Sequence, residues 1–180
     1  MKRIFYIFLV LIIGIVIFVW YAGAFEKIQI TDTTDGPYVI AGLEHKGSYS
    51  KIPNTFMEVE KILGGLDIKM ERTLGIYNDD PSKVEEADLR SFAAAIIEGD
   101  ALNQIQALSA TSLKLDTIEN NSSLVVDLYA RSAFSYMIYP MKVYPAFEQM
   151  MTEKGYTPAI AYEVYEVDHK NVRYVWQYSK

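Results

Sequence analysis

The segment from Thr157 to Asp168, TPAIAYEVYEVD, combines the composition of a β-strand with two carboxylates that could do chemistry. Its isoleucine, valine and tyrosine residues favour extended backbone. Side chains alternate between the two faces of a strand, which places Glu163 and Glu166 on opposite faces. If one face lines a core, one glutamate points inward. A buried carboxylate then needs a ligand, a hydrogen-bonding partner or a raised pKa, because an unpaired buried charge is costly.

Patterns for metal, cofactor or nucleophilic chemistry are weak elsewhere. The chain contains no cysteine, which excludes disulfides, thiolate metal sites and a cysteine nucleophile. Its histidines, His45 and His169, fit no zinc-binding spacing, and no serine-hydrolase or phosphate-binding motif is present. We interpret Asp79-Asp80-Pro81 as a turn in which aspartate binds backbone groups. The sequence therefore predicts no catalytic residue, no metal and no cofactor.

The charge balance argues against a nucleic-acid partner. The net charge is −6, and lysine and arginine form no cluster. Nucleic-acid binding requires a basic face. We therefore expect no nucleic-acid contact, whereas a cationic partner is electrostatically easier.

The N-terminus carries an apolar segment long enough to cross a membrane. Ile4 to Trp20 contains no charge, and continuing to Phe25 gives about 20 mainly apolar residues, enough for a hydrocarbon layer of about 30 Å. Lys2 and Arg3 precede this segment, which predicts a cytoplasmic N-terminus. We therefore expect a bacterial single-pass protein of the cell membrane with an extracytoplasmic, periplasmic domain.

Three parts of the chain follow from this interpretation. They are an anchor over residues 1–25, which crosses the membrane through 4–24, a linker over 26–36, and a domain over 37–180. A cleaved signal peptide is the alternative, because Ala22-Gly23-Ala24 has the small-x-small form of a cleavage site. The apolar run is longer than a typical signal core, which favours the anchor. In either case the domain is exported.

Strand and helix patterns alternate along this domain. β-Branched and aromatic runs bounded by turn residues predict strands, and apolar stripes of helical spacing predict helices. Residues 113–118 and 124–129 are predicted to form a hairpin around 119–122. The other predicted elements are strands at 38–45, 74–77, 92–97, 157–168 and 172–178, helices at 53–63 and 143–153, and a short helix with a loop in 101–112.

The second half of this pattern repeats the first. A shift of 88 residues without a gap aligns Phe56 with Tyr144 and Tyr77 with Tyr165. Each half contains a strand, a helix and two further strands. This order, taken twice, predicts an α+β fold in which two helices pack on one antiparallel sheet. A duplicated domain has a pseudo-two-fold axis, and the junction of its halves is a natural pocket.

Three motifs on these elements resemble the GyrI-like family of gyrase-inhibitor-like, effector-binding domains. HKGSY, residues 45–49, resembles the family's H-x-G-x-Y after its first strand. GIYNDDP, residues 75–81, resembles its G-x-Y-x-D-P turn, and YEVY, residues 162–165, resembles its terminal aromatic-Glu-x-Tyr motif. The motifs occur in order on the expected elements, and the resemblance covers residues 36–178.

The apolar N-terminus makes the chain similar to the membrane-anchored branch of that family. This branch includes an animal testis-expressed receptor for selective autophagy of the endoplasmic reticulum. The chain ends at Lys180 without that receptor's long disordered tail, so we do not expect the receptor function here. No helix-turn-helix segment is evident, so a transcription-regulator role is not expected either.

The resemblance implies a role for Glu163. In the family, this glutamate lies in an aromatic pocket between the two halves and pairs with cationic or polar ligands. In a hydrolase branch it assists attack on strained electrophiles. A carboxylate among aromatic rings suits a lipophilic cation, since a cation–π contact adds about 0.5–2 kcal/mol. The residues expected to form the ligand site are Glu163, Tyr165, Tyr49, Tyr77, Tyr136 and Trp176.

We therefore predict a membrane-tethered domain that binds or senses a small amphipathic or cationic molecule. Two alternatives stay open. One is a hydrolase of reactive small molecules in which Glu163 acts as general base. The other is a protein-interaction domain, of unknown partner, whose pocket is filled by its own side chains. Each aromatic residue could instead serve only to pack the core. Glu163 could instead be a solvated strand residue or form a structural hydrogen bond to a tyrosine.

Overall fold

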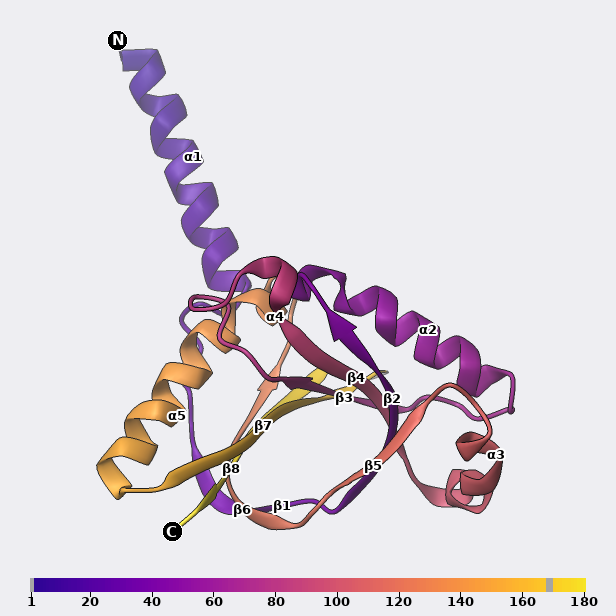
Figure 1. Cartoon of the computed structure of the whole chain (residues 1–180). Coiled ribbons are helices and arrows are strands. Elements are labelled where there is room, and N and C mark those ends of the chain that lie inside the picture. The colour runs from indigo at the N-terminus through magenta and orange to yellow at the C-terminus, as the bar shows by residue number, and fades with distance from the viewer. Residues whose placement is uncertain (1, 168–169) are drawn as a thin grey trace.

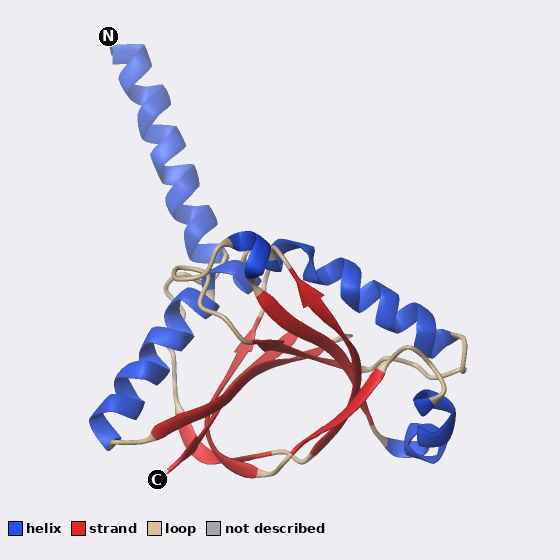
Figure 2. Ribbon diagram, in the orientation of Figure 1, coloured by secondary structure: helices blue, strands red, loops and turns tan. Residues whose placement is uncertain are grey.

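The computed structural model describes residues 2–167 and 170–180, and an eight-stranded antiparallel sheet forms its centre. The strand order is β1-β6-β8-β7-β3-β4-β2-β5. The predicted α+β fold with helices packed on one antiparallel sheet is confirmed (Figure 2). Asp168 and His169, at the predicted end of one strand, lie outside the described residues. The strands are β1 Thr31–Asp35, β2 Tyr38–Lys46, β3 Arg72–Tyr77, β4 Arg90–Ile97, β5 Lys114–Ile118, β6 Asn121–Tyr129, β7 Thr157–Glu166 and β8 Asn171–Ser179.

The helices cover the outer face of this sheet, which curls around its inner face (Figure 1). One apolar cluster on the inner face contains Ile118 from β5 and Val125 from β6, although these strands lie towards opposite edges of the sheet. A second cluster joins α2 and α3 to β2 and β4, and a third joins α5 to β6 and β8. The helices are α1 Lys2–Tyr21, α2 Ile52–Gly64, α3 Ile105–Ser109, α4 Ser135–Ile138 and α5 Pro140–Lys154, with short 3-10 helices η1 Tyr49–Lys51, η2 Glu86–Asp88 and η3 Gly99–Gln104.

The predicted hairpin of residues 113–118 with 124–129 is wrong as a pairing. Both strands exist, but β5 pairs with β2, whereas β6 pairs with β1 and β8. β1 lies within residues 26–36, which we expected to be a linker, and it completes the edge beside β6. The physical reason is an exchange between the repeats. The strand that precedes each half pairs with the first strand of the other half, so the turn-forming residues 119–122 connect strands that are not neighbours.

The N-terminal helix α1 projects from the domain (Figure 1). Its segment Ile4–Tyr21 has a mean hydropathy of 2.9, and none of it is buried against the rest of the chain. By length and composition this helix is able to cross a membrane.

Candidate functional site

Glu163 lies where the two repeats meet. At the centre of the sheet β3 pairs with β7, and Gly75 is the direct partner of Glu163. These two residues are also related by the repeat, because 163 − 75 = 88. On either side of them, Leu74 pairs with Val164 and Ile76 pairs with Tyr162. The shift of 88 residues converts each of these two pairs into the other. The pseudo-two-fold axis therefore passes between this glycine and this glutamate.

The Glu163 side chain is 3% exposed and points towards the helix-covered face of the sheet. Its Oε1 accepts a hydrogen bond of 2.9 Å from the Tyr144 hydroxyl on α5. Its Oε2 accepts a short hydrogen bond from the hydroxyl of Tyr165 on the same strand. The question raised by the strand sequence is thereby answered: the inward glutamate is held by tyrosine hydroxyls.

The chain of hydroxyls continues across the pseudo-two-fold axis. The Tyr77 hydroxyl lies 3.1 Å from the hydroxyl of its repeat equivalent Tyr165. Gly75 makes room for this arrangement, because a Cβ at that position would lie 3.1 Å from the Tyr77 ring. One half of the duplication therefore supplies the carboxylate, and the other half supplies the space that a tyrosine fills.

Aromatic rings surround this hydroxyl chain. The Tyr49 ring packs on Tyr77 with centroids 5.1 Å apart, and the Tyr136 ring packs on Tyr165 at 5.8 Å. Trp176 contacts Tyr144 at 6.0 Å. The structure thus brings all the residues predicted for the site together, although only Tyr165 among them contacts the carboxylate through a hydrogen bond.

Three further residues of this shell were not predicted. Tyr144 donates to Glu163, Tyr174 is fully buried beside Tyr144, and the Phe56 ring packs on Tyr165 at 6.3 Å. The sequence contained a signal for each. The shift of 88 residues pairs Phe56 with Tyr144, and strand alternation places Tyr174 on the same face as Trp176. In the described part of the chain the Tyr174 hydroxyl has no hydrogen-bond partner.

Burial controls the protonation of this site. Burial raises the pKa of Glu163 to about 7, although the hydrogen bonds from Tyr165 and Tyr144 act in the opposite direction. Burial, together with the nearby Glu163, also raises the pKa of Tyr144 and Tyr165 well above the ordinary value. The tyrosines therefore remain protonated donors, and Glu163 is the group that changes charge near neutral pH.

Replacing Tyr144 by phenylalanine tests this hydrogen-bonded arrangement. The variant removes one donor to a buried carboxylate, which is worth about 1.5–3 kcal/mol for a charged acceptor. We expect the pKa of Glu163 to rise further, and the free energy of unfolding to fall by about 2 kcal/mol at pH 8 and by less at pH 5. Urea unfolding at both pH values measures this. An equal loss at both pH values would contradict the hydrogen bond to an ionised carboxylate. Tyr129→Phe, at an exposed tyrosine, is the matched control.

The acidic pair after β3 forms a turn. The Asp79 carboxylate accepts two hydrogen bonds from the Arg90 guanidinium, at 2.8 and 3.0 Å, and one from its backbone N–H. The Asp80 Oδ1 accepts hydrogen bonds from the backbone and hydroxyl of Ser82. Arg90 holds the pKa of the Asp79 carboxyl below its ordinary value. Both carboxylates therefore have local partners, as the turn interpretation requires.

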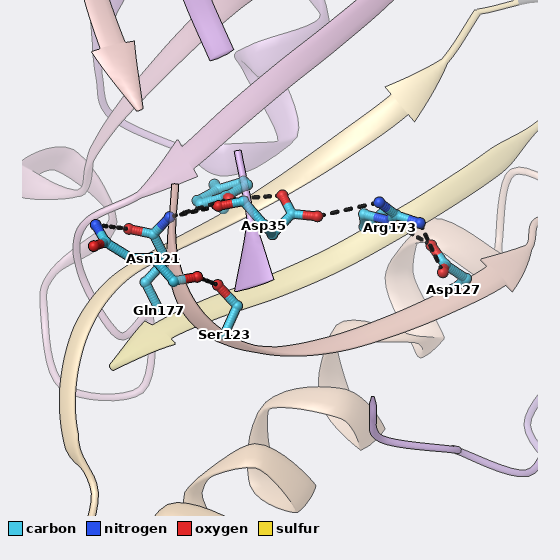
Figure 3. A network of polar contacts seen from close by, with 7 residues as sticks. Asp35, Asn121, Ser123, Asp127, Arg173 and Gln177 are labelled. Atoms are coloured by element: carbon cyan, nitrogen blue, oxygen red, sulfur yellow. Dashed lines mark hydrogen bonds and ion pairs between the residues drawn. The ribbon is translucent and has the colours of Figure 1, made fainter. Parts of the chain in front are cut away.

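A second polar network lies on the inner face of the sheet (Figure 3). Asp35, at the end of β1, is 5% exposed and accepts hydrogen bonds from Tyr162, at 2.8 Å, and Arg173, at 3.1 Å. Arg173 also donates two hydrogen bonds to Asp127 on β6. Gln177 donates to the Glu119 carbonyl at 2.8 Å. Because these groups satisfy one another, we assign the network to fastening the β1 edge.

Comparisons with known proteins place the fold. No family model matches the chain, and no curated protein matches it in sequence. The C-terminal domain of EcmrR has a TM-score of 0.55 at 11% identity, covering 85% of this chain and 98% of that one. SAV2435, solved with bound tetraphenylphosphonium, has a TM-score of 0.53 at 10% identity, covering 85% and 94%. An uncharacterized conserved protein from Listeria innocua has a TM-score of 0.51 at 13% identity, covering 85% and 93%. The chain therefore shares the fold of these proteins.

Proposed function

We propose that this chain is a membrane-tethered, GyrI-like domain that binds a small lipophilic cation at Glu163. The observation that carries the proposal is a buried carboxylate at the junction of the repeats, held by two neutral hydroxyls. Among the described residues this shell is neutral, so the ionised form of Glu163 has no ion-pair partner there. A cation that enters the shell supplies that charge, and the surrounding rings add cation–π contacts.

Ligand entry requires the aromatic shell to open, because Glu163 is almost completely covered. Tyr144 comes from α5 and Tyr136 from α4, so movement of these helices would expose the carboxylate. The Tyr174 hydroxyl, buried and without a partner in the described residues, supplies a further polar group for the bound molecule. The fold that this chain shares with SAV2435, which was solved with a lipophilic cation, supports the same class of ligand.

The closed shell also favours a second candidate function. Tyrosine rings fill the space around Glu163, as a protein-interaction domain with a self-filled pocket would require. Such a domain would have no small-molecule response. A ligand screen separates the two proposals.

The screen uses the full-length chain in detergent and measures thermal unfolding with lipophilic cations, neutral aromatics and anions. A ligand at 100 times its dissociation constant stabilises the folded state by about 2.7 kcal/mol. We expect stabilisation by cations and much less by neutral or anionic compounds of similar size. The absence of any stabilisation would reject the ligand-binding proposal in favour of the interaction domain.

A further inference from the structure

α4 and the start of α5 form one continuous helical segment. The Tyr139 backbone N–H donates to the Ser135 carbonyl, and the Val143 N–H donates to the Tyr139 carbonyl, both at 2.9 Å. These three residues recur at a spacing of four and are all buried. The segment therefore packs one face firmly against the domain.

Its other face carries large apolar side chains that remain largely exposed in the described chain. Phe134 is 49% exposed, Met137 68% and Met141 77%, and their spacing of three and four residues places them on one side of the helix. Phe25 is 66% exposed and lies close by in the fold, because Lys142 binds the carbonyls on either side of it. We call Phe25, Phe134, Met137 and Met141 the α4 patch. Large apolar side chains that are exposed together in this way mark a candidate interaction site.

Helix α4 lies where α1 leaves the domain (Figure 1). The Phe18 ring of α1 contacts the Phe134 ring with centroids 4.9 Å apart. The Tyr21 hydroxyl donates to the Arg131 carbonyl at 3.3 Å. Gly23 has a φ of +92° and packs so closely that a Cβ there would lie 2.6 Å from the Tyr139 ring. The exit of α1 is therefore fixed against this segment.

This contact sets the depth of the α4 patch relative to a membrane. Phe18 precedes Tyr21, the last residue of the apolar helix, by three residues, which is about 4.5 Å along the axis. A side chain that touches Phe18 thus lies at the level of the interface when α1 spans the bilayer. Amphipathic surface helices bury their apolar face about 5–10 Å into that region.

We propose that the α4 patch inserts into the lipid bilayer and seats the domain directly on the membrane surface. The inference rests on the proposed tether through α1. It assigns one wall of the Glu163 site to the membrane, because Tyr136 lies on α4 and its ring packs on Tyr165. A lipophilic molecule dissolved in the bilayer then meets this wall first.

The absence of cysteine allows a direct test. Single cysteines replace Met137, Met141, Val10 or Leu102 in the full-length chain, each is labelled with the fluorophore NBD, and the protein is reconstituted into phosphatidylcholine vesicles. Val10 lies within α1 and reports the tether. Leu102, 43% exposed in η3, is the control away from the patch. Quenching by lipids brominated on their acyl chains is compared with quenching by aqueous iodide.

We expect brominated lipids to quench the labels at positions 137 and 141 at least twofold more than the label at 102, with iodide showing the reverse order. A second outcome is strong lipid quenching at position 10 together with lipid quenching at 137 and 141 that is no greater than at 102. This outcome would overturn the inference and leave the tether intact. Weak lipid quenching at position 10 would overturn the tether and the inference together. Labels at 137 and 141 protected from both quenchers would show that another protein surface covers the patch, which also overturns the inference.

Discussion

The wild-type protein is expected to lose about 2–3 kcal/mol of unfolding free energy relative to a Glu163→Gln variant as the pH rises from 5 to 8. The pKa of Glu163 is about 7 in the folded state against a reference value of 4.5. Between these values the folded state binds more protons than the unfolded state, so stability falls as the pH rises. A difference of about 2.5 units at 1.36 kcal/mol each amounts to about 3.4 kcal/mol over the whole titration. Most of this loss falls between pH 5 and pH 8, and the rest falls below pH 5, where the unfolded state begins to ionise. Glutamine keeps the shape of the side chain but cannot ionise.

Urea unfolding of both proteins in detergent at pH 5, 6, 7 and 8 measures this difference. The matched control is Glu166→Gln on the same strand, whose carboxylate accepts a hydrogen bond from Asn171 near the surface. The control should retain the wild-type pH profile. If the wild type and Glu163→Gln remained parallel over the whole range, Glu163 would be solvated or already paired with a cation.

An Arg173→Met variant is expected to lower the free energy of unfolding by about 3 kcal/mol. The side chain of Asp35 is 4% exposed, and Arg173 is its cationic partner. Removing one partner of a buried ion pair costs about 3–5 kcal/mol, because it leaves an uncompensated charge. We expect the lower end of that range, since the Arg173 side chain is 43% exposed and Tyr162 still donates to Asp35.

The second ion pair of Arg173, with Asp127, provides a control for the effect of losing an ion pair at the surface. Asp127 is 61% exposed, so Asp127→Asn removes an exposed ion pair and should cost at most about 1 kcal/mol. Adding Asp35→Asn to Arg173→Met should recover part of the loss, because the unpaired charge disappears. Equal losses for Arg173→Met and Asp127→Asn would contradict the assignment of the inner-face network as the fastening of β1.

The core of the fold could be predicted from the sequence because the repeat preserves its pattern. The shift of 88 residues that aligns Tyr77 with Tyr165 also joins them in space, since the pseudo-two-fold axis passes between their strands. Strand alternation placed Glu163 and Tyr165 on one face of their strand. Local periodicity placed Glu163 and Glu166 on opposite faces, and the resemblance of YEVY to the family motif selected Glu163 as the inward one. Its two hydroxyl partners depended on tertiary packing.

The edges of the sheet could not be predicted because they depend on contacts between the halves. β1 is a polar strand, TDTTD, whose pairing with β6 has no local signal apart from its threonines. The segment between β5 and β6 has the composition of a hairpin turn, but the strand order separates the two strands, because each pairs with strands other than its chain neighbour. Both faces of β7 are buried, because the curled sheet encloses one face and the helices cover the other. Tyr162 and Val164 therefore line the inner core, while Glu163 faces the helices.

The measurement that most directly tests the central claim is the binding of tetraphenylphosphonium to the full-length chain at pH 8 and pH 5. Calorimetric titration in detergent, with Glu163→Gln as the reference for partition into micelles, gives the dissociation constants. Because the pKa of Glu163 is about 7, a cation that requires the ionised form should bind about 100-fold more weakly at pH 5 than at pH 8. We predict this pH dependence in the wild type and its loss, together with most of the affinity, in Glu163→Gln. Equal binding by the two proteins at both pH values would contradict the assignment of Glu163 as the ligand-binding carboxylate.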